Sequence, residues 1–262
     1  MQIYGLPALE TNYFWLLQPD SAQPEAYIFD PGDAQPVLRA LEQYRLTLAG
    51  IVLTHHHWDH TDGIDELLEH NQVPVYGPDN ERIAHISHPL ADGDELQLGE
   101  TCWQVMTTPG HTLDHIVYYR ADAEPDGVLI AGDTLFAGGC GRMFEGTPEV
   151  FLRSLTKLAQ LPAHTVLYCS HEYTLANLAF AQAVEPNNQA IARRLAAERA
   201  KRGQGRPTLP SNIALELATN PFLRCTEPEI IANAAAYSGG QLHSAEEVFA
   251  TLRQWKNEFP GN

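Results

Sequence analysis

The run THHHWDH, from residue 54 to residue 60, constrains this chain of 262 residues more than any other feature. It follows the apolar segment LAGIV at 48–52, whose composition is typical of a buried strand. The histidines therefore begin where a strand is expected to open into a loop, at a sheet edge. Such a density of imidazole and carboxylate groups indicates a metal site. Its candidate ligands are His55, His57, Asp59 and His60, with His56 and Trp58 as spacers.

Imidazole and carboxylate ligands suit zinc or iron, and the lack of cysteines close by in the sequence disfavours a closed thiolate site. One tetrahedral ion cannot easily use all four ligands, because adjacent residues such as Asp59 and His60 point in different directions. Two ions are the simpler interpretation, and they need further ligands. Three more candidates follow strand-like segments: His111 after WQVMTTPG, Asp133 after GVLIAG and His171 after TVLYCS. Each of them alone could be an ordinary loop residue, but together with the histidine run they indicate further ligands.

The order of these motifs resembles the metallo-β-lactamase superfamily: THHHWDH, then TPGHTLDH, AGDTLF and SHEYT. Two further segments resemble one family within it, glyoxalase II or hydroxyacylglutathione hydrolase. They are FAGGCGRMFEG at 136–146 and NPFLR at 220–224. The resemblance covers essentially the whole chain, from NYFWLL at 12–17 and FDPG at 29–32 to a tail ending in LRQWKNEF.

The resemblance implies a site with two divalent metal ions, most simply zinc, with iron or manganese as alternatives. It assigns His55, His57 and His111 to one ion, Asp59, His60 and His171 to the other, and Asp133 to a bridge between them. Asp59 and Asp133 would thus belong to the catalytic machinery. The implied reaction is hydrolysis of S-D-lactoylglutathione to D-lactate and glutathione, the second step of methylglyoxal detoxification, by a hydroxide that bridges the metals. The other histidines match no ligand position, although His115 is close enough to His111 in sequence to brace the site.

The same resemblance assigns four side chains to substrate binding: Arg142, Phe144, Tyr173 and Arg224. Charge supports the two arginines. The net charge is −17, yet residues 142–262 carry 12 Lys+Arg against 11 Asp+Glu, whereas residues 1–141 carry 4 against 22. Local cations are therefore needed to attract a glutathione carboxylate. Phe144 stands where many members have tyrosine, and no lysine follows Arg224 closely, so weaker glutathione binding is expected.

The expected fold is α/β: a metallo-β-lactamase-like αββα sandwich at 1–170 and a C-terminal helical, substrate-binding domain at 171–262. Strands are predicted at 50–54, 103–108, 128–132 and 165–170, and helices at 36–44 and 148–158, the latter with Thr147 as N-cap and Pro148 as its first residue. After residue 171 we expect helices and no strand. The predicted helices there are 174–184, 188–202, 228–237 and 244–259.

Other functional classes fit the sequence less well. The acidic charge opposes nucleic-acid binding, in spite of the basic segment at 192–202. No apolar stretch is long enough for a membrane span, and the N-terminus lacks the features of a signal peptide, so we expect a cytoplasmic monomer with free cysteines. A persulfide dioxygenase and a lactonase or β-lactamase remain as alternatives, and the segments at 136–146 and 220–224 argue against both. A non-enzymatic metal-binding module is a further alternative, which the complete ligand set opposes.

Overall fold

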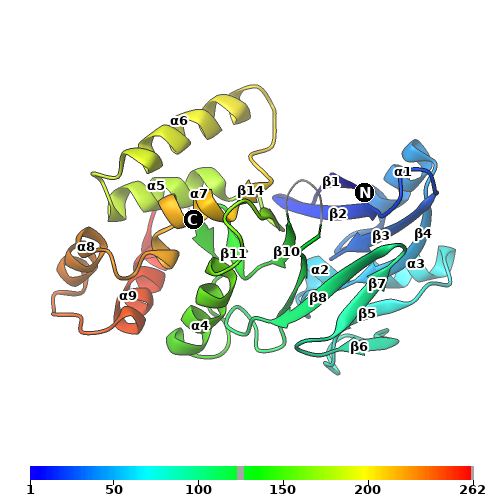
Figure 1. Cartoon of the computed structure of the whole chain (residues 1–262), viewed down its shortest axis with the longest axis horizontal. Helices are drawn as coiled ribbons and strands as arrows, with labels where there is room; N and C mark the ends of the chain where they lie inside the picture. Colours follow the sequence, from blue (N-terminus) through cyan, green and yellow to red (C-terminus); the bar gives the residue numbers. More distant parts are fainter. Residues whose placement is uncertain (123–126, 261–262) are drawn as a thin grey trace. The chain divides into compact units, whose positions relative to one another are not determined.

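The computed structural model describes residues 1–122 and 127–260, and its internal contacts divide the chain into two compact units. Unit 1 comprises Met1–Thr108 and Asp114–Gly132, and unit 2 comprises Pro109–Leu113 and Asp133–Asn262. Figure 1 labels the helices and strands of both units. The predicted domain boundary at residue 170 stays a prediction.

Unit 1 contains a six-stranded sheet whose strands follow one another in chain order, from β1 to β6. The first three strands are antiparallel neighbours, and the pairs from β3 to β6 are parallel. Helical segments connect β3 with β4 and β4 with β5, since parallel neighbours need a crossover connection. The strands are β1 (Gln2–Ala8), β2 (Asn12–Gln18), β3 (Glu25–Phe29), β4 (Thr47–Val52), β5 (Val75–Pro78) and β6 (His88–Leu90).

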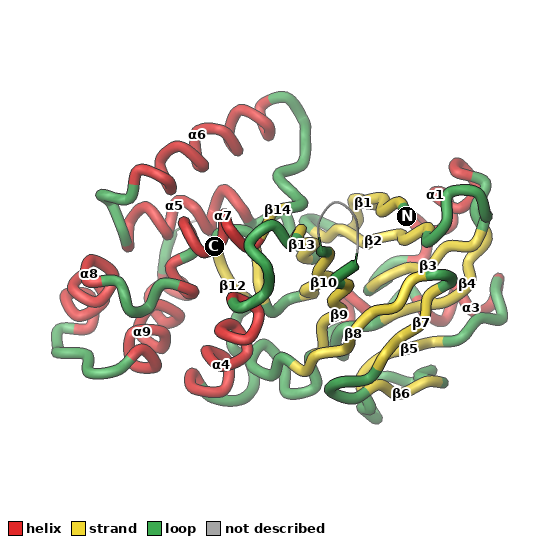
Figure 2. Tube along the Cα trace, in the orientation of Figure 1, coloured by secondary structure: helices red, strands yellow, loops and turns green. Residues whose placement is uncertain are grey.

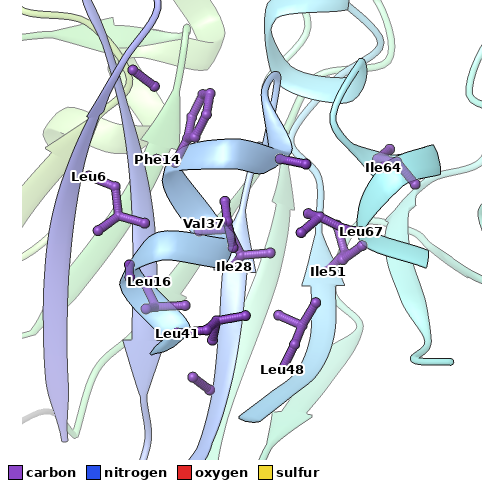
Figure 3. Packing of buried hydrophobic residues seen from close by; sticks show 14 of the residues in the cluster. Leu6, Phe14, Leu16, Ile28, Val37, Leu41, Leu48, Ile51, Ile64 and Leu67 are labelled. Carbon is purple, nitrogen blue, oxygen red and sulfur yellow. The ribbon is translucent and has the colours of Figure 1, made fainter. Parts of the chain in front are cut away.

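One face of this sheet is covered by helices α1 (Ala34–Tyr44) and α3 (Ile64–His70). Figure 3 shows Val37 and Leu41 of α1 directed at the strand residues Leu16 and Ile28. Strand β2 is buried along its whole length, because its alternate side chains enter the packing on both faces of the sheet. The sheet and the helices thereby hold β4, and the histidine run after it, in a fixed position.

The opposite face packs on a second set of strands in unit 1: β7 (Glu95–Leu98), β8 (Thr101–Thr107), β9 (Ile116–Arg120) and β10 (Val128–Gly132). Phe29 of β3 meets Trp103 with ring centroids 6.0 Å apart, and meets Tyr118 edge-on at 5.6 Å. The hydroxyl of Tyr118 donates to the Leu53 carbonyl over 2.6 Å, one residue before the histidine run. The two layers of strands are therefore joined directly behind that run.

Unit 2 is mainly helical after strand β13 (Val166–Cys169), as Figure 2 shows by colour. The helices predicted at 148–158, 174–184, 188–202, 228–237 and 244–259 are present as α4 (Pro148–Ala159), α5 (Thr174–Val184), α6 (Gln189–Gly203), α8 (Pro228–Ser238) and α9 (Ala245–Glu258). The expectation of no strand beyond residue 171 is wrong. Strand β14 (Ser211–Asn212) pairs antiparallel with β13, followed by α7 (Ile213–Thr219) and the 3₁₀ helix η1 (Pro221–Leu223).

A buried ion pair fixes the hairpin of β11 (Leu135–Phe136) and β12 (Gly139–Cys140) in unit 2. Arg194 of α6 contacts Glu216 of α7 at 2.6 Å, and both side chains are almost completely buried. The second oxygen of Glu216 accepts from the Gly138 amide over 2.7 Å, in the turn of the hairpin. Asn220 donates to the Gly139 carbonyl over 2.8 Å. The segment between Asp133 and Arg142 is thus held by the helical part of the chain.

Candidate metal centre

The structure brings together the four candidate ligands of the histidine run in unit 1, here called the N-terminal donor set. His55 and His57 lie in the loop after β4, and Asp59 and His60 lie in the one-turn helix α2 (Trp58–Thr61). The distance from His55 Nε2 to His57 Nδ1 is 3.0 Å, and the rings of His55 and His60 have centroids 4.2 Å apart. The tight turn of α2 returns the chain so that His60 Nε2 lies 3.5 Å from Asp59 Oδ2.

Asp30, buried at the end of β3, orients two of these histidines. Its two oxygens accept from the Thr54 amide over 2.7 Å and from the Thr54 hydroxyl over 2.8 Å. That hydroxyl lies 2.9 Å from Nδ1 of His55, and Asp30 Oδ2 lies 3.2 Å from Nδ1 of His60. Because both Nδ1 atoms are directed at this carboxylate and its threonine, the Nε2 atoms are the ones placed to bind a metal.

Asp59 is held by a close approach of two backbone segments in unit 1. Its Oδ2 accepts from the Asn12 side-chain amide over 3.0 Å. A Cβ atom at Gly32 would lie only 2.0 Å from the Asp59 carbonyl oxygen, so only glycine permits this approach. The segment FDPG thus serves the site twice, through the Asp30 carboxylate and through the missing side chain of Gly32.

Two histidines outside the predicted ligand set also support the loop. His115 is fully buried, and its ring stacks on that of His55 with centroids 4.8 Å apart, so it supports the site through ring contact. His56, expected only as a spacer, has Nδ1 2.9 Å from Asp114 Oδ1 and Nε2 2.9 Å from an Arg82 nitrogen. Its side chain therefore ties the histidine run to two neighbouring loops of unit 1.

Unit 2 brings together the other three candidate ligands, His111, Asp133 and His171, here called the C-terminal donor set. The Nε2 atoms of His111 and His171 lie 3.4 and 3.3 Å from the same oxygen, Oδ2 of Asp133. All three residues are buried. Two imidazole nitrogens converging on one carboxylate oxygen is an arrangement that suits ligands of a shared cation.

The orientation of His111 is set by the segment that follows β12. Nδ1 of His111 lies 2.7 Å from the Arg142 carbonyl oxygen, which can only accept. Nδ1 therefore carries the proton, and Nε2 keeps its lone pair for a metal. A Cβ atom at Gly141 would lie 2.0 Å from the Asp133 carbonyl oxygen and 2.9 Å from His111 Nδ1. Glycine at 141 is required for this approach.

The chemistry of both donor sets fits a divalent metal ion. Each set combines imidazoles with a carboxylate, which are ligands that zinc, iron and manganese accept. Cysteine is not expected to contribute. Burial raises the pKa of the Cys169 thiol, two residues before His171, to about 12, so it is no thiolate at neutral pH.

Three of the four predicted substrate residues border the C-terminal donor set. The Arg142 guanidinium lies 5.5 Å from the Phe144 ring centroid, and the edge of the Phe144 ring meets His111 at 5.4 Å. The Tyr173 ring stacks on that of His171 at 4.7 Å with an interplanar angle of 1°. Phe144 and Tyr173 are both exposed. Side chains next to two ligands are thus open to a bound molecule.

Arg224, the fourth predicted substrate residue, is bound to a protein carboxylate. Its Nη2 and Nε donate to the two oxygens of Glu185 over 2.6 and 3.1 Å, and Nη1 donates to the Leu217 carbonyl over 3.2 Å. The hydrogen bonds from Arg224 to Glu185 raise the pKa of its guanidinium. These contacts favour a structural role, because an incoming carboxylate would have to compete with Glu185.

Two buried cations on α9, Arg253 and Lys256, were not predicted from the sequence. Arg253 Nη1 donates to the carbonyls of Cys140 and Gly141 over 3.0 and 3.3 Å, and so holds the backbone next to Arg142. Lys256, one turn later, is also buried, and burial, with the charge of Arg253, lowers the pKa of its ammonium group to about 8. The signal was present in RQWK, because residues three apart share a helix face.

Within the described residues, 1–122 and 127–260, no helix is both long and apolar enough to cross a lipid bilayer. Residues 15–171 match the family model of the metallo-β-lactamase superfamily, and residues 172–259 match that of the hydroxyacylglutathione hydrolase C-terminus.

Curated relatives match the chain over its full length. A hydroxyacylglutathione hydrolase of Idiomarina loihiensis is 48% identical over 98% of this chain and 99% of its own. One of Pseudomonas fluorescens is 50% identical over 99% of this chain and 100% of its own. Such agreement from end to end favours this family over the alternatives considered from the sequence.

Solved structures share the expected fold. The ETHE1 protein of Myxococcus xanthus has a TM-score of 0.65 at 26% identity and covers 98% of both chains. The BLEG-1 B3 metallo-β-lactamase has a TM-score of 0.63 at 25% identity and covers 85% of this chain and 99% of its own. The prediction of a metallo-β-lactamase-like fold with a C-terminal helical region is confirmed.

Proposed function

We propose, since the chain belongs to the hydroxyacylglutathione hydrolase family of metallo-β-lactamase-fold enzymes, that it hydrolyses S-D-lactoylglutathione to D-lactate and glutathione. The family consists of metal-dependent hydrolases, and the chain carries a divalent-metal site. The observation that carries the proposal is the pair of donor sets, one in each unit, on a chain that matches its relatives from end to end.

The proposed site joins the two donor sets around two ions. Each of the groups His55–His57–His111, His55–His60–Asp133 and Asp59–His60–His171 offers ligand atoms that could hold one ion. We assign one ion to His55, His57 and His111, the other to Asp59, His60 and His171, and the bridge to Asp133. Bound divalent ions would supply an activated water as nucleophile and polarise the thioester carbonyl. Zinc is the proposed metal, with iron or manganese as substitutes.

The protein side chains bind and orient the substrate. We assign Arg142 to a glutathione carboxylate, and Phe144 and Tyr173 to contacts with the glutathione backbone or thioester, because all three border His111 or His171. Lys256 and Arg253 are further cations of unit 2 that suit an anionic ligand, and Arg224 is the least favoured of the predicted residues because Glu185 holds it. The leaving thiolate has a conjugate acid of pKa about 8.5, so it departs without a general acid.

We further propose that the enzyme acts on a small glutathione thioester, as a cytoplasmic monomer that does not bind nucleic acid or membranes. The acidic charge supports the exclusion of nucleic acid, since binding to phosphates depends on clustered Lys and Arg.

The direct test is hydrolysis of S-D-lactoylglutathione by the purified chain, followed through loss of thioester absorbance and release of thiol, before and after chelation. We expect turnover that a chelator abolishes and zinc restores. His57→Ala should lower kcat/KM by at least about 100-fold and reduce bound metal. His70→Ala, at an exposed histidine at the end of α3, is the matched control and should leave both unchanged.

Two results would contradict the proposal. Absence of turnover in a fully metallated sample would redirect the search to another carbonyl substrate, with the metal site retained. Turnover that survives complete removal of metal would overturn the metal-dependent mechanism.

A further inference from the structure

Two loops of unit 2 are joined by hydrogen bonds at three places. The first, the metal loop, is Pro109–Leu113 and contains His111. The second, the substrate loop, is the segment 142–146 and contains Arg142 and Phe144. His111 Nδ1 donates to the Arg142 carbonyl over 2.7 Å, and the Phe144 amide donates to the His111 carbonyl over 3.2 Å. The Leu113 amide donates to Glu145 Oε2 over 2.7 Å.

Glu145 provides the third of these bonds with its side chain, which the proposed chemistry does not use. The bond has a charged acceptor, which makes it stronger than a bond between two neutral groups. Gly146 has a φ of 78°, and a Cβ atom there would lie 3.4 Å from Leu113 Cδ2, so the substrate loop turns directly against the metal loop. Helix α4 begins immediately afterwards, capped by the Thr147 hydroxyl. Glu145 thus adds a second side-chain link between the two loops, next to that of His111, at the point where α4 begins.

The position of the substrate loop sets the chemistry of His111. The Arg142 carbonyl fixes the proton on Nδ1, and therefore the direction of the Nε2 lone pair. The same few residues carry the Arg142 guanidinium and the exposed Phe144 ring. A ligand that binds these side chains consequently acts on the segment that orients a metal ligand.

We propose that Glu145 is a positioning residue that couples substrate binding to metal affinity at His111. The identity of the ligand rests on the proposed function, whereas the effect of Glu145 on zinc affinity rests on the loop geometry alone. By linkage, if a glutathione ligand tightens zinc binding by some factor, zinc tightens that ligand by the same factor. The carboxylate of Glu145 transmits this effect by holding the two loops together.

The test uses the full chain and two equilibrium measurements. The zinc Kd is measured by competition with a chromophoric chelator, with and without S-methylglutathione, whose blocked sulfur cannot take zinc as a thiolate. The Kd of S-methylglutathione is measured on zinc-loaded and metal-depleted protein. Glu145→Ala should weaken zinc binding about 10-fold. The coupling factor, which is the ratio of the zinc Kd without S-methylglutathione to the zinc Kd with it, should fall towards 1. KM for the thioester should rise as well.

Three variants separate positioning from general destabilisation. Glu145→Gln keeps an acceptor for the Leu113 amide and should retain most of the coupling. Glu145→Asp keeps the charge but withdraws it by one methylene, so it should lose coupling even if Glu145→Ala does not fold. Glu149→Ala removes an exposed carboxylate in the first turn of α4, where it pairs only loosely with Arg153 at 3.5 Å, and should change neither Kd.

An unchanged zinc Kd and coupling factor in both Glu145→Ala and Glu145→Asp would overturn the proposal. If the wild-type chain does not bind S-methylglutathione at all, the glutathione function and the coupling both fail, whereas the zinc Kd of the Glu145 variants still decides the positioning role. A lower melting temperature with an intact coupling factor would show a merely structural residue and would also contradict the proposal.

Discussion

Asp30 shows how a single buried carboxylate can determine the geometry of several metal ligands. It has a φ of 51°, unusual for a residue with a side chain, and this conformation turns the carboxylate towards Thr54. Both of its oxygens are acceptors in the bonds that orient His55 and His60. A strained backbone conformation at a buried acid is consistent with a functional constraint.

We therefore predict that Asp30→Asn weakens zinc binding by about 10- to 100-fold, since an amide offers one acceptor oxygen where the carboxylate offers two. The Thr54 amide and hydroxyl cannot both be satisfied, and the histidine rings lose their orientation. Competition with a chromophoric chelator measures the effect. Asp62→Asn, at an exposed carboxylate at the end of α2, is the matched control. A zinc Kd within twofold of wild type for Asp30→Asn would show that the rings are oriented by other contacts.

At the scale of secondary-structure elements, the sequence predicted what local chemistry determines. Helix α4 begins after Thr147, with Pro148 in its first turn, as predicted, because capping and proline geometry depend on adjacent residues. Strand β14 was missed, since a strand of two residues exists only through its pairing with β13, far away in the sequence. The contact of Arg224 with Glu185 was not predicted either, because the two residues are 39 positions apart in the sequence.

Helix α9 carries a testable consequence of burying a cation. Burial, and then the charge of Arg253, lowers the pKa of Lys256 from 10.5 to about 8, so the folded state disfavours its charged form. Between about pH 8 and 10.5 the unfolded chain binds more protons than the folded chain, and this group's contribution to stability therefore rises with pH across that window. Below pH 8 the penalty is present in full.

Lys256→Met should accordingly raise the melting temperature of the ligand-free protein by a few degrees at pH 7, with a smaller gain as pH approaches 10. Thermal unfolding of both proteins from pH 6.5 to pH 10 measures the difference. Lys157→Met, in the last turn of α4, is the control. The difference in melting temperature between this variant and the wild type should not become smaller as the pH rises. A Lys256→Met protein that is less stable than wild type at pH 7 would show that the ammonium group is well compensated in the fold.

At the scale of the whole molecule, the candidate ligands come from two compact units. The donor types could be predicted from the sequence, because histidine and aspartate in these motifs have few other uses together. The contacts that orient these ligands could not be predicted from the sequence. The Asp30 carboxylate and the Arg142 carbonyl are distant in sequence from the ligands that they orient, and only the folded chain brings them together.

If metal ions join the two donor sets, removing them should destabilise both units together. Ligand binding to the folded state adds RT ln(1 + [L]/Kd) to the free energy of unfolding, about 2.7 kcal/mol at 100 times Kd. We predict that chelation lowers the melting temperature by several degrees and that zinc restores it. Hydrogen exchange should show lost protection in both segments 51–62 and 130–142. Asp133→Ala, which removes the proposed bridge, should reduce the fall in melting temperature that the chelator causes. Loss of protection confined to segment 51–62 would mean that the C-terminal donor set does not share the ions, and the two-metal assignment would then be wrong.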